Sequence, residues 1–185
     1  MMSSTAAESA LEAQSSTADR AALRQRFDRL LAQEGAALSR LAGSYSNSAG
    51  DRDDLLQEIA LAVWLALPRF RGECSERTFL FRIAHNRAVR SLAHTRSRRQ
   101  KSEPETDVPD PRPSPEADLV QQQQRERLLR AIRKLPVPFR QVVTLSLEGL
   151  DYTEAAQVLG ISESNVGARL SRARQMLRRN LEEQS

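Results

Sequence analysis

Cysteine is nearly absent from this chain of 185 residues. Cys74 is the only one, so an intramolecular disulfide and a cysteine-rich zinc site are both excluded, and a reducing cytoplasm fits. The two histidines, His85 and His94, have no cysteine or carboxylate partner at ligand spacing, which argues against a metal site. The sequence also lacks a catalytic carboxylate pair, a nucleophile with its base and a phosphate-binding loop, so we expect no enzyme and no cofactor.

Long apolar runs are missing as well. The longest, residues 59–67, is far shorter than the ~20 residues that span a bilayer. No lysine or arginine precedes Arg20, and no apolar segment lies near the start, so we expect no signal peptide. Residues 1–18 are rich in alanine, serine and glutamate and are predicted to form a disordered tail. The expectation is a soluble cytoplasmic protein with no direct membrane insertion.

The net charge of +4 conceals an uneven distribution. The chain has 28 basic and 24 acidic residues, a balance that by itself says little about a polyanionic partner. Residues 69–101 contain ten basic and two acidic residues, a local net charge of +8. Residues 103–118 contain six acidic residues and one arginine, a local net charge of −5. This segregation predicts separate roles for the two segments.

The apolar residues recur at helical spacing, and no strand pattern occurs. Five prolines among the acidic residues at 102–118 exclude a regular element there and predict an extended linker. The expected fold class is therefore all-α: two small helical domains joined by an extended acidic, proline-rich linker, the second ending in a helix-turn-helix. The expected boundaries are residues 19–101, 102–118 and 119–185.

The second domain ends in two short helices joined by a tight turn. Asp151 and Glu154 have the spacing of a capping box, which predicts a helix from about Tyr152. Gly160 is expected to end that helix, because glycine turns the chain without a Cβ penalty. Ser162 is expected to cap the next helix.

This last helix has one apolar and one basic face. Residues 169–179 contain five arginines and no acid. Small side chains near the start of a helix allow close approach to a DNA groove, and arginines further along reach phosphates or guanine edges. A solvated helix hairpin is the alternative. The cap, the glycine and the one-sided basic face together favour a helix-turn-helix that binds DNA. The residues expected at the DNA are Ser164, Asn165, Ala168, Arg169, Arg172 and Arg174.

Residues 51–67 predict a helix with apolar residues on two faces. One face forms a buried stripe before Pro68, made of Leu55, Ile59, Val63 and Leu67. The second carries Leu56, Ala60 and Trp64. Such a helix is either wholly buried or contacts a partner, and the sequence favours neither interpretation.

A strongly basic helix is expected to follow Ser75, which can cap it. Its predicted core positions are Phe79, Ile83, Ala84, Ala88 and Leu92. The other face carries basic and amide side chains suited to phosphates and unstacked bases, with a merely solvated helix as the alternative. These residues are Arg82, Asn86, Arg87, Arg90, His94 and Arg98.

Four motifs, in order and spacing, resemble the extracytoplasmic-function sigma factors of bacterial RNA polymerase. They are DRDDLLQEI, FRGE followed by FLFRIAHNRAV, KLP-x-x-FRQV-x-x-L, and DYTEAAQVLGISESNVGARLSRARQML. The family holds only sigma domains two and four, which the resemblance places at residues 19–101 and 119–185. It implies a protein that directs core polymerase to specific promoters, melts the minus-ten element and initiates transcription, while the polymerase supplies the catalysis.

The resemblance also assigns residues to partners. Contact with the clamp helices of core polymerase is implied for Asp54, Leu55, Gln57, Glu58 and Ile59. Capture and melting of the minus-ten element are implied for Phe70, Arg71, Gly72, Glu73, Arg82, Asn86, Arg87 and Arg90. Residues 164–174 correspond to the reader of the minus-thirty-five element. An anti-sigma factor that silences the protein, and a monomer outside the holoenzyme, are implied as well.

Two other classes of protein compete with this interpretation. A free-standing helix-turn-helix repressor or activator would need a dimerisation helix or sensor domain, and it would leave the DLLQEI segment without a purpose. An anti-sigma type of interaction protein does not explain two basic faces. The family pattern is also not matched everywhere: Phe79 stands where tryptophan is common and Arg90 where aspartate is frequent, so base preference is not carried over.

Overall fold

The computed structural model describes the backbone of residues 3–99 and 116–183, and the side chains of residues 19–94 and 123–183. Every regular element in these ranges is a helix, which confirms the predicted all-α class. The elements are α1 (Ser3–Tyr45), α2 (Ala49–Ala66), a 3-10 turn η1 (Leu67–Arg69), α3 (Glu76–Arg99), α4 (Glu116–Arg133), α5 (Val137–Leu147), α6 (Tyr152–Leu159) and α7 (Glu163–Glu182). The predicted linker lies outside the described residues except for 116–118, which belong to α4.

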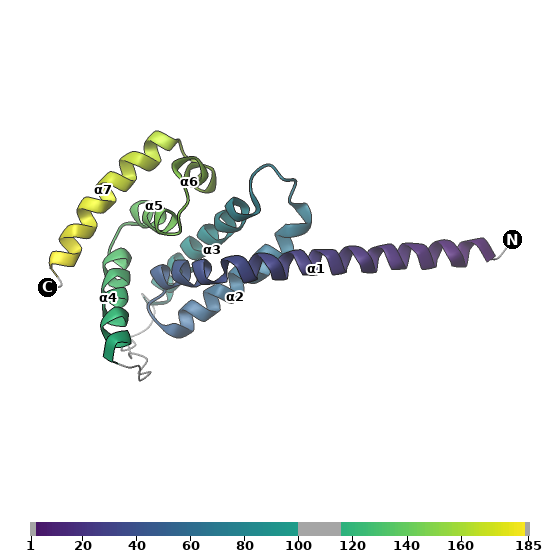
Figure 1. Ribbon diagram of the computed structural model, residues 1–185, viewed down its shortest axis with the longest axis horizontal. Helices are drawn as coiled ribbons and strands as arrows, with labels where there is room; N and C mark the ends of the chain where they lie inside the picture. The colour runs from purple at the N-terminus through teal and green to yellow at the C-terminus, as the bar shows by residue number, and fades with distance from the viewer. Residues whose placement is uncertain (1–2, 100–115, 184–185) are drawn as a thin grey trace.

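Helices α1, α2 and α3 pack on one another and form the N-terminal bundle (Figure 1). The predicted stripe of α2 is confirmed, since Leu55, Ile59, Val63 and Leu67 are all buried. Ser48 caps α2, with its hydroxyl accepting from the Asp51 N–H at 3.1 Å, so the helix begins slightly before the predicted residue 51. Trp64 packs edge-on against Phe27 of α1, with 5.2 Å between ring centroids, so α1 covers part of the second apolar face.

Helix α1 is much longer than the sequence predicts. It begins at Ser3, so the prediction of a disordered tail over residues 1–18 is wrong from Ser3 onward. Alanine, glutamate, leucine and glutamine are strong helix formers, and no glycine or proline interrupts the chain before Gly35. Low hydrophobicity suggested disorder, but a helix propagates easily once a packed segment has nucleated it. Its first half projects away from the rest of the chain (Figure 1).

The buried face of α3 differs from the predicted one. Leu80 and Phe81 are fully buried together with Ala84 and Ala88, whereas Phe79 is only half-buried. Phe79 instead packs against Phe70 in the preceding loop, with ring centroids 4.6 Å apart. The helix is therefore rotated so that Phe79 faces the loop, a choice that the apolar spacing alone does not determine.

Helices α4 to α7 form the C-terminal bundle, whose core includes Ile132, Val142 and Leu170. Leu147 does not belong to this core, because its side chain is 58% exposed and Leu145 is buried instead. Helix α5 ends at Leu147, and the chain then turns through Gly149. The side chain of this last helical residue therefore points to solvent and does not pack against the other helices of the bundle.

The two bundles meet at a buried arginine on α5. Arg140 is 4% exposed and donates to the carbonyl oxygens of Arg133 and Leu135 at the end of α4, and to that of Ser44 on α1 at 3.5 Å. Its guanidinium also lies 5.3 Å from the ring centroid of Tyr45, a cation–π arrangement. One side chain thus caps α4 and ties α5 to the end of α1.

A buried histidine lies next to this junction. His85 on α3 is 1% exposed, and its Nδ1 lies 3.3 Å from the Tyr45 hydroxyl. Burial lowers the pKa of His85 to about 3, because the charged imidazolium loses its hydration. Burial likewise raises the pKa of the Tyr45 hydroxyl well above its usual range. Both groups are therefore neutral in the folded protein near neutral pH.

We predict that His85 makes the fold sensitive to mild acid. The unfolded chain takes up a proton here below about pH 6.5, whereas the folded chain does so only near pH 3, so stability is complete above 6.5 and falls as the pH drops. Lowering the pH from 7 to 5 should reduce the free energy of unfolding by about 2 kcal/mol, as urea titrations at each pH would show. His85→Asn should remove most of this dependence, and His94→Asn, at an exposed site, should retain it. An unchanged slope in His85→Asn would refute the assignment.

Candidate nucleic-acid interface

The turn between α6 and α7 is built as the sequence predicts. The Asp151 carboxylate accepts from the Glu154 N–H at 2.8 Å, and the Glu154 carboxylate accepts from the Asp151 N–H at 3.0 Å, which completes the capping box. Gly160 ends α6 with φ at +66°, in the left-handed region that favours glycine. The Ser162 hydroxyl then accepts from the Asn165 N–H at 3.3 Å and starts α7.

Helix α7 presents the predicted polar face to solvent. Val166, Leu170 and Ala173 are buried against α5 and α6, and this fixes the rotation of the helix. The residues predicted to contact DNA are exposed, except Arg169, which is partly exposed. The structure therefore brings Ser164, Asn165, Ala168, Arg169, Arg172 and Arg174 onto solvent-facing sides of one helix.

Two of these residues are coupled. The Arg169 Nε donates to the Asn165 Oδ1 at 2.9 Å, one helical turn earlier. This bond engages the Nε of Arg169, and no bond of its terminal nitrogens is found among the described residues. The amide group of Asn165 remains available as a donor, so the pair presents adjacent donors to a groove.

Two contacts that the sequence did not reveal hold α7 in place. The Thr153 hydroxyl on α6 donates to the Glu163 carboxylate at the start of α7, at 2.9 Å. The Tyr152 ring lies so close to Gly167 that a Cβ there would be 3.4 Å from it. Both contacts join residues from two helices, and only the folded turn brings them together.

A pocket of about 220 Å³ lies at the start of α3. It is lined by Arg69, Phe70, Arg71, Glu73, Cys74, Phe79 and Arg82. Gly72 forms the bend of this loop with φ at +77°. Pockets for drug-sized molecules are larger, about 300–1,000 Å³, so this one suits a smaller flat group between aromatic and cationic walls. Four of the eight residues predicted for the minus-ten element line it: Phe70, Arg71, Glu73 and Arg82.

The basic face of α3 extends away from this pocket. Asn86 and Arg90 are exposed, Arg87 is partly exposed, and Arg82 is partly buried at the pocket wall. The NH2 group of Arg82 donates to the backbone carbonyl of Gln157 on α6 at 3.0 Å. One residue predicted to contact DNA is therefore bound to the C-terminal bundle in this structure.

The exposed face of α2 differs from the one implied by the family motif. Asp54, Gln57 and Glu58 are exposed, but Leu55 and Ile59 are 1% and 0% exposed, so these two support the helix from inside and do not contact a partner directly. Leu61 and Leu65 are 60% and 62% exposed instead. We call Asp54, Gln57, Glu58, Leu61 and Leu65 the α2 stripe. Sequence analysis missed both leucines because they lie outside the two apolar faces that it considered.

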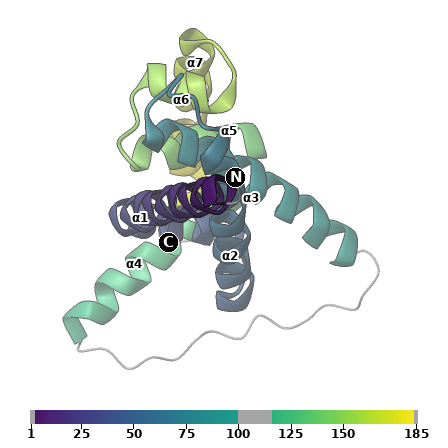
Figure 2. The same ribbon diagram turned by 90° about the vertical axis from the view of Figure 1, so that its right-hand side faces the viewer.

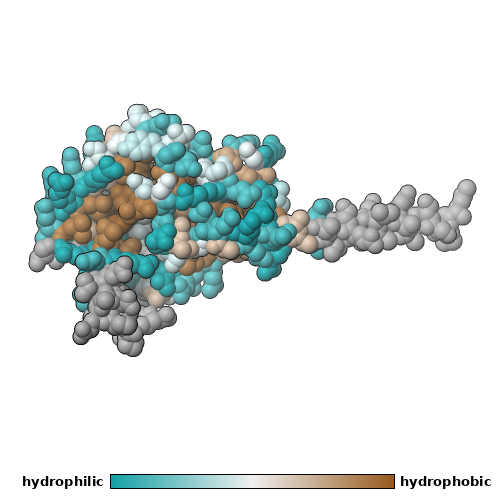
Figure 3. Space-filling model, in the orientation of Figure 1, coloured by the Kyte–Doolittle hydropathy of each residue, from teal (hydrophilic) through white to brown (hydrophobic). Residues whose placement is uncertain are grey.

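A second apolar surface lies on the C-terminal bundle. In the view of Figure 3 it appears as a brown area over α4, α5 and α7, bordered by hydrophilic residues. Leu128 of α4 is 37% exposed, and Met176 and Leu177 of α7 are half-buried. This surface, like the α2 stripe, is suited to a protein partner.

Within the described side chains, no group of three or more histidine, cysteine, aspartate or glutamate residues is arranged to hold a metal ion. Among the described helices, none has the length and apolarity that crossing a membrane requires.

Comparison with known proteins identifies both bundles. Residues 30–99 match the family model for sigma-70 region 2, and residues 125–177 match that for sigma-70 region 4. The chain is 31% identical over 160 residues to the ECF RNA polymerase sigma factor SigM of Mycobacterium tuberculosis, a match that covers 85% of this chain and 78% of SigM. The chain belongs to the extracytoplasmic-function (ECF) sigma factors.

Other relatives agree with this assignment. The RNA polymerase sigma factor CnrH of Cupriavidus metallidurans is 31% identical over 161 residues, which cover 82% of this chain and 84% of CnrH. The solved structure of CnrH in complex with the cytosolic domain of CnrY matches with a TM-score of 0.66 at 28% identity and covers 88% of this ECF sigma factor and 91% of that chain. The predicted family, fold class and role in promoter-directed transcription initiation are thus confirmed.

We predict that Asn165 and Arg169 act on DNA as one unit. On a duplex selected from a random pool by the wild-type holoenzyme, each alanine substitution should cost about 1–3 kcal/mol of binding. The double substitution should cost less than the sum by about 0.5 kcal/mol or more, because each single change already disturbs their shared hydrogen bond.

The matched control combines Asn165→Ala with Arg178→Ala. These residues are thirteen positions apart on α7, roughly 20 Å along the helix, so their effects should add. Filter-binding or fluorescence titrations of the duplex measure the binding free energy of the single and double variants for both pairs of residues. Additive costs for Asn165 with Arg169 would show that the bond has no part in recognition.

Proposed function

We propose that this ECF sigma factor divides its work among three surfaces: the α2 stripe for core polymerase, the pocket with the basic face of α3 for the minus-ten element, and α7 for the minus-thirty-five element. The bounds proposed for sigma domains two and four are residues 19–101 and 119–185. The observation that carries the proposal is the α2 stripe. Two leucines with about 60% exposure beside three polar residues need a partner on a helix that is otherwise packed into a core.

The α2 stripe has the composition of an interface. Leu61 and Leu65 supply an apolar centre, and Asp54, Gln57 and Glu58 supply polar groups at one end. Leu55 and Ile59, which the resemblance also assigned to this contact, anchor the helix in the core and so fix the stripe in space. The proposed partner surface is the clamp helices of core polymerase.

The pocket is the proposed site for a base flipped out of the minus-ten element. Unstacking a base costs a few kcal/mol, which aromatic and cationic contacts within a pocket can offset. Phe70 and Phe79 form an aromatic wall, and the Arg26 guanidinium lies 5.1 Å from the Phe70 ring centroid. Asn86, Arg87 and Arg90 continue from the pocket as contacts to the phosphates of the melting duplex.

The proposed function includes a protein inhibitor and excludes catalysis by this chain. CnrH has been solved with CnrY, and by analogy we propose that an anti-sigma factor binds this ECF sigma factor, using the α2 stripe or the apolar surface over α4, α5 and α7. Outside the holoenzyme the chain is proposed to be a monomer that acts in the cytoplasm. No cofactor or metal enters this mechanism, and the polymerase performs the chemistry.

In vitro transcription tests the proposal as a whole. Purified core polymerase should produce specific transcripts from genomic fragments only when the chain is added. The rival function, a free-standing repressor, predicts the opposite pattern: the chain alone would bind an operator at nanomolar concentration and would not associate with core.

We predict that core binding depends on the two exposed leucines. Leu61→Asn with Leu65→Asn should weaken binding to core at least tenfold, because central apolar residues of an interface commonly contribute more than ~1 kcal/mol each. Thermal stability should change little, since both side chains are mostly exposed in the free protein. Leu147→Asn is the control, because Leu147 is 58% exposed but lies on α5. Equal losses in both variants would remove the α2 stripe from the proposal.

A further inference from the structure

The loop of residues 70–75, which joins η1 to α3, shapes the pocket at the start of α3. It contributes four of the seven residues that line the pocket. No regular element lies within this loop, and Gly72 bends it at a positive φ. A short irregular segment keeps one shape only where contacts at its ends or from neighbouring elements fix it. The shape of the pocket therefore depends on what holds the loop.

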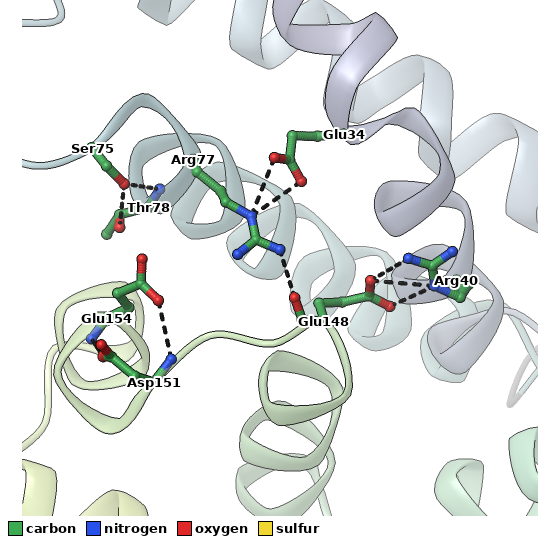
Figure 4. A network of polar contacts seen from close by, with 8 residues as sticks. All are labelled: Glu34, Arg40, Ser75, Arg77, Thr78, Glu148, Asp151 and Glu154. Carbon is green, nitrogen blue, oxygen red and sulfur yellow. Dashed lines mark hydrogen bonds and ion pairs between the residues drawn. The ribbon is translucent and has the colours of Figure 1, made fainter.

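The backbone is held at both ends of the loop. At the start, the Phe70 N–H donates to the Leu67 carbonyl at 3.2 Å and closes η1. At the end, the Ser75 hydroxyl accepts from the Thr78 N–H at 3.0 Å and lies 2.8 Å from the Thr78 hydroxyl (Figure 4). These contacts start α3, but they leave the Phe70 side chain, which forms a wall of the pocket, to be fixed by other groups.

Arg26 of α1 bridges the two ends of the loop. Its Nε donates to the Glu76 carboxylate at 2.7 Å, and its guanidinium lies 5.1 Å from the Phe70 ring centroid. Phe70 is the first residue of the loop and Glu76 is the first residue of α3, so one side chain contacts both sides. The Arg26 and Glu76 side chains are 32% and 35% exposed, so water screens the pair only in part.

The packing of α1 determines that Arg26 reaches the loop. Phe27, the next residue, packs edge-on against Trp64 of α2, and Leu30 is buried one turn later. Helix α1 also contacts η1, and Figure 1 shows the end of α2 beside the part of α1 from which the projecting half extends. Figure 2 shows α1 nearly end-on, with α2 and α3 packed beside it. The apolar contacts of α1 thus fix the side from which Arg26 approaches.

A held aromatic ring binds a base more tightly than a free one. A side chain that is ordered before binding has less conformational freedom to lose when its partner arrives. The Phe70 ring is ordered from two directions, by the Arg26 guanidinium and by the Phe79 ring, whose centroid lies 4.6 Å away. An ion pair fixes the guanidinium in turn, so Glu76 acts on Phe70 through Arg26.

We propose that Arg26 is a positioning residue of the pocket. It holds the Phe70 ring ready to stack on an unpaired base of the minus-ten element, without touching that base. Arg26 does not line the pocket, and it precedes residues 30–99, which match sigma-70 region 2. The proposal rests on the function proposed above, because it takes the pocket to be the site of base capture.

The first test measures the loop in the free protein. Cys74 is the only cysteine and lies half-buried in the loop, so its rate of alkylation by neutral iodoacetamide reports how readily the loop opens. Arg26→Ala and Glu76→Ala should each raise this rate at least about twofold, because either change releases the bridge. Charge alone predicts opposite effects, since loss of a cation disfavours the reactive thiolate and loss of an acid favours it.

The matched controls are Arg24→Ala and Asp28→Ala. These residues form an ion pair at 2.9 Å within α1, so their removal changes the same charges on a pair that lies within one helix. Both controls should keep the alkylation rate of the parent protein. A rate in Arg26→Ala at or below that of the parent would overturn the positioning role.

The second test measures base capture by the holoenzyme. The ligand is a fluorescent single-stranded DNA, selected from a random pool by the parent holoenzyme, and its bases are removed one at a time. The position whose removal weakens binding by the parent identifies the captured base. Arg26→Ala should weaken binding to the intact strand about two- to tenfold, the range expected for ordering one side chain. On the strand that lacks this base the loss should vanish.

An arginine that contacts phosphate would behave differently, because its removal weakens binding to both strands alike. Equal losses on the two strands in Arg26→Ala would therefore refute the inference. Arg26→Lys, which can still pair with Glu76 and lie over the Phe70 ring, should recover most of the loss on the intact strand.

The two tests separate this inference from the proposed function. If no base matters to the parent while the alkylation rates rise, base capture by the pocket fails and only the contact between Arg26 and the loop stands. If one base matters but Arg26→Ala loses equally on both strands, base capture stands and the positioning role fails.

Discussion

The burial of the Arg140 guanidinium between the two bundles is the constraint on which much of the structure depends. A buried cation is costly unless it is hydrogen-bonded, and here carbonyl oxygens from α1 and from the end of α4 accept from both terminal nitrogens of Arg140. The same residue lies against the Tyr45 ring, whose hydroxyl lies next to His85 of α3. The position of α5 relative to α1 and α3 is thus set by directional bonds, in addition to apolar contact that would tolerate sliding.

Several polar contacts between the bundles are bonds from arginine to backbone oxygens. Arg77, Arg82 and Arg133 each donate to a carbonyl of the other bundle, at Glu148, Gln157 and Ser46. Such bonds specify position in addition to the apolar contacts, because the buried apolar residues of both bundles belong to one cluster. Water or phosphate oxygens can replace each carbonyl, so the net free energy of every bond is modest.

Local signals in the sequence predicted much of the structure, and tertiary contacts account for what was missed. The Asp151 capping box and the Gly160 turn depend on residues a few positions apart, so their spacing was sufficient. The exposure of Leu61 and the burial of His85 depend on how α1 and α3 lie against neighbouring helices, which no periodicity reports. The solvent-facing residues of α7 were predictable because an amphipathic helix leaves one face free. The engagement of Arg82 by α6 was not, since it joins residues 75 positions apart.

The distribution of arginine ties these observations together. A guanidinium has five donors in a fixed plane and stays charged in nearly every environment, so it binds a carbonyl, a carboxylate or a phosphate with little change in geometry. Arg82 can therefore hold the Gln157 carbonyl in one conformation and a phosphate in another without being remade. A lysine there would hold the carbonyl less directionally, and an apolar residue would hold neither acceptor. The residue type that suits a DNA surface thus also suits the contact between the bundles.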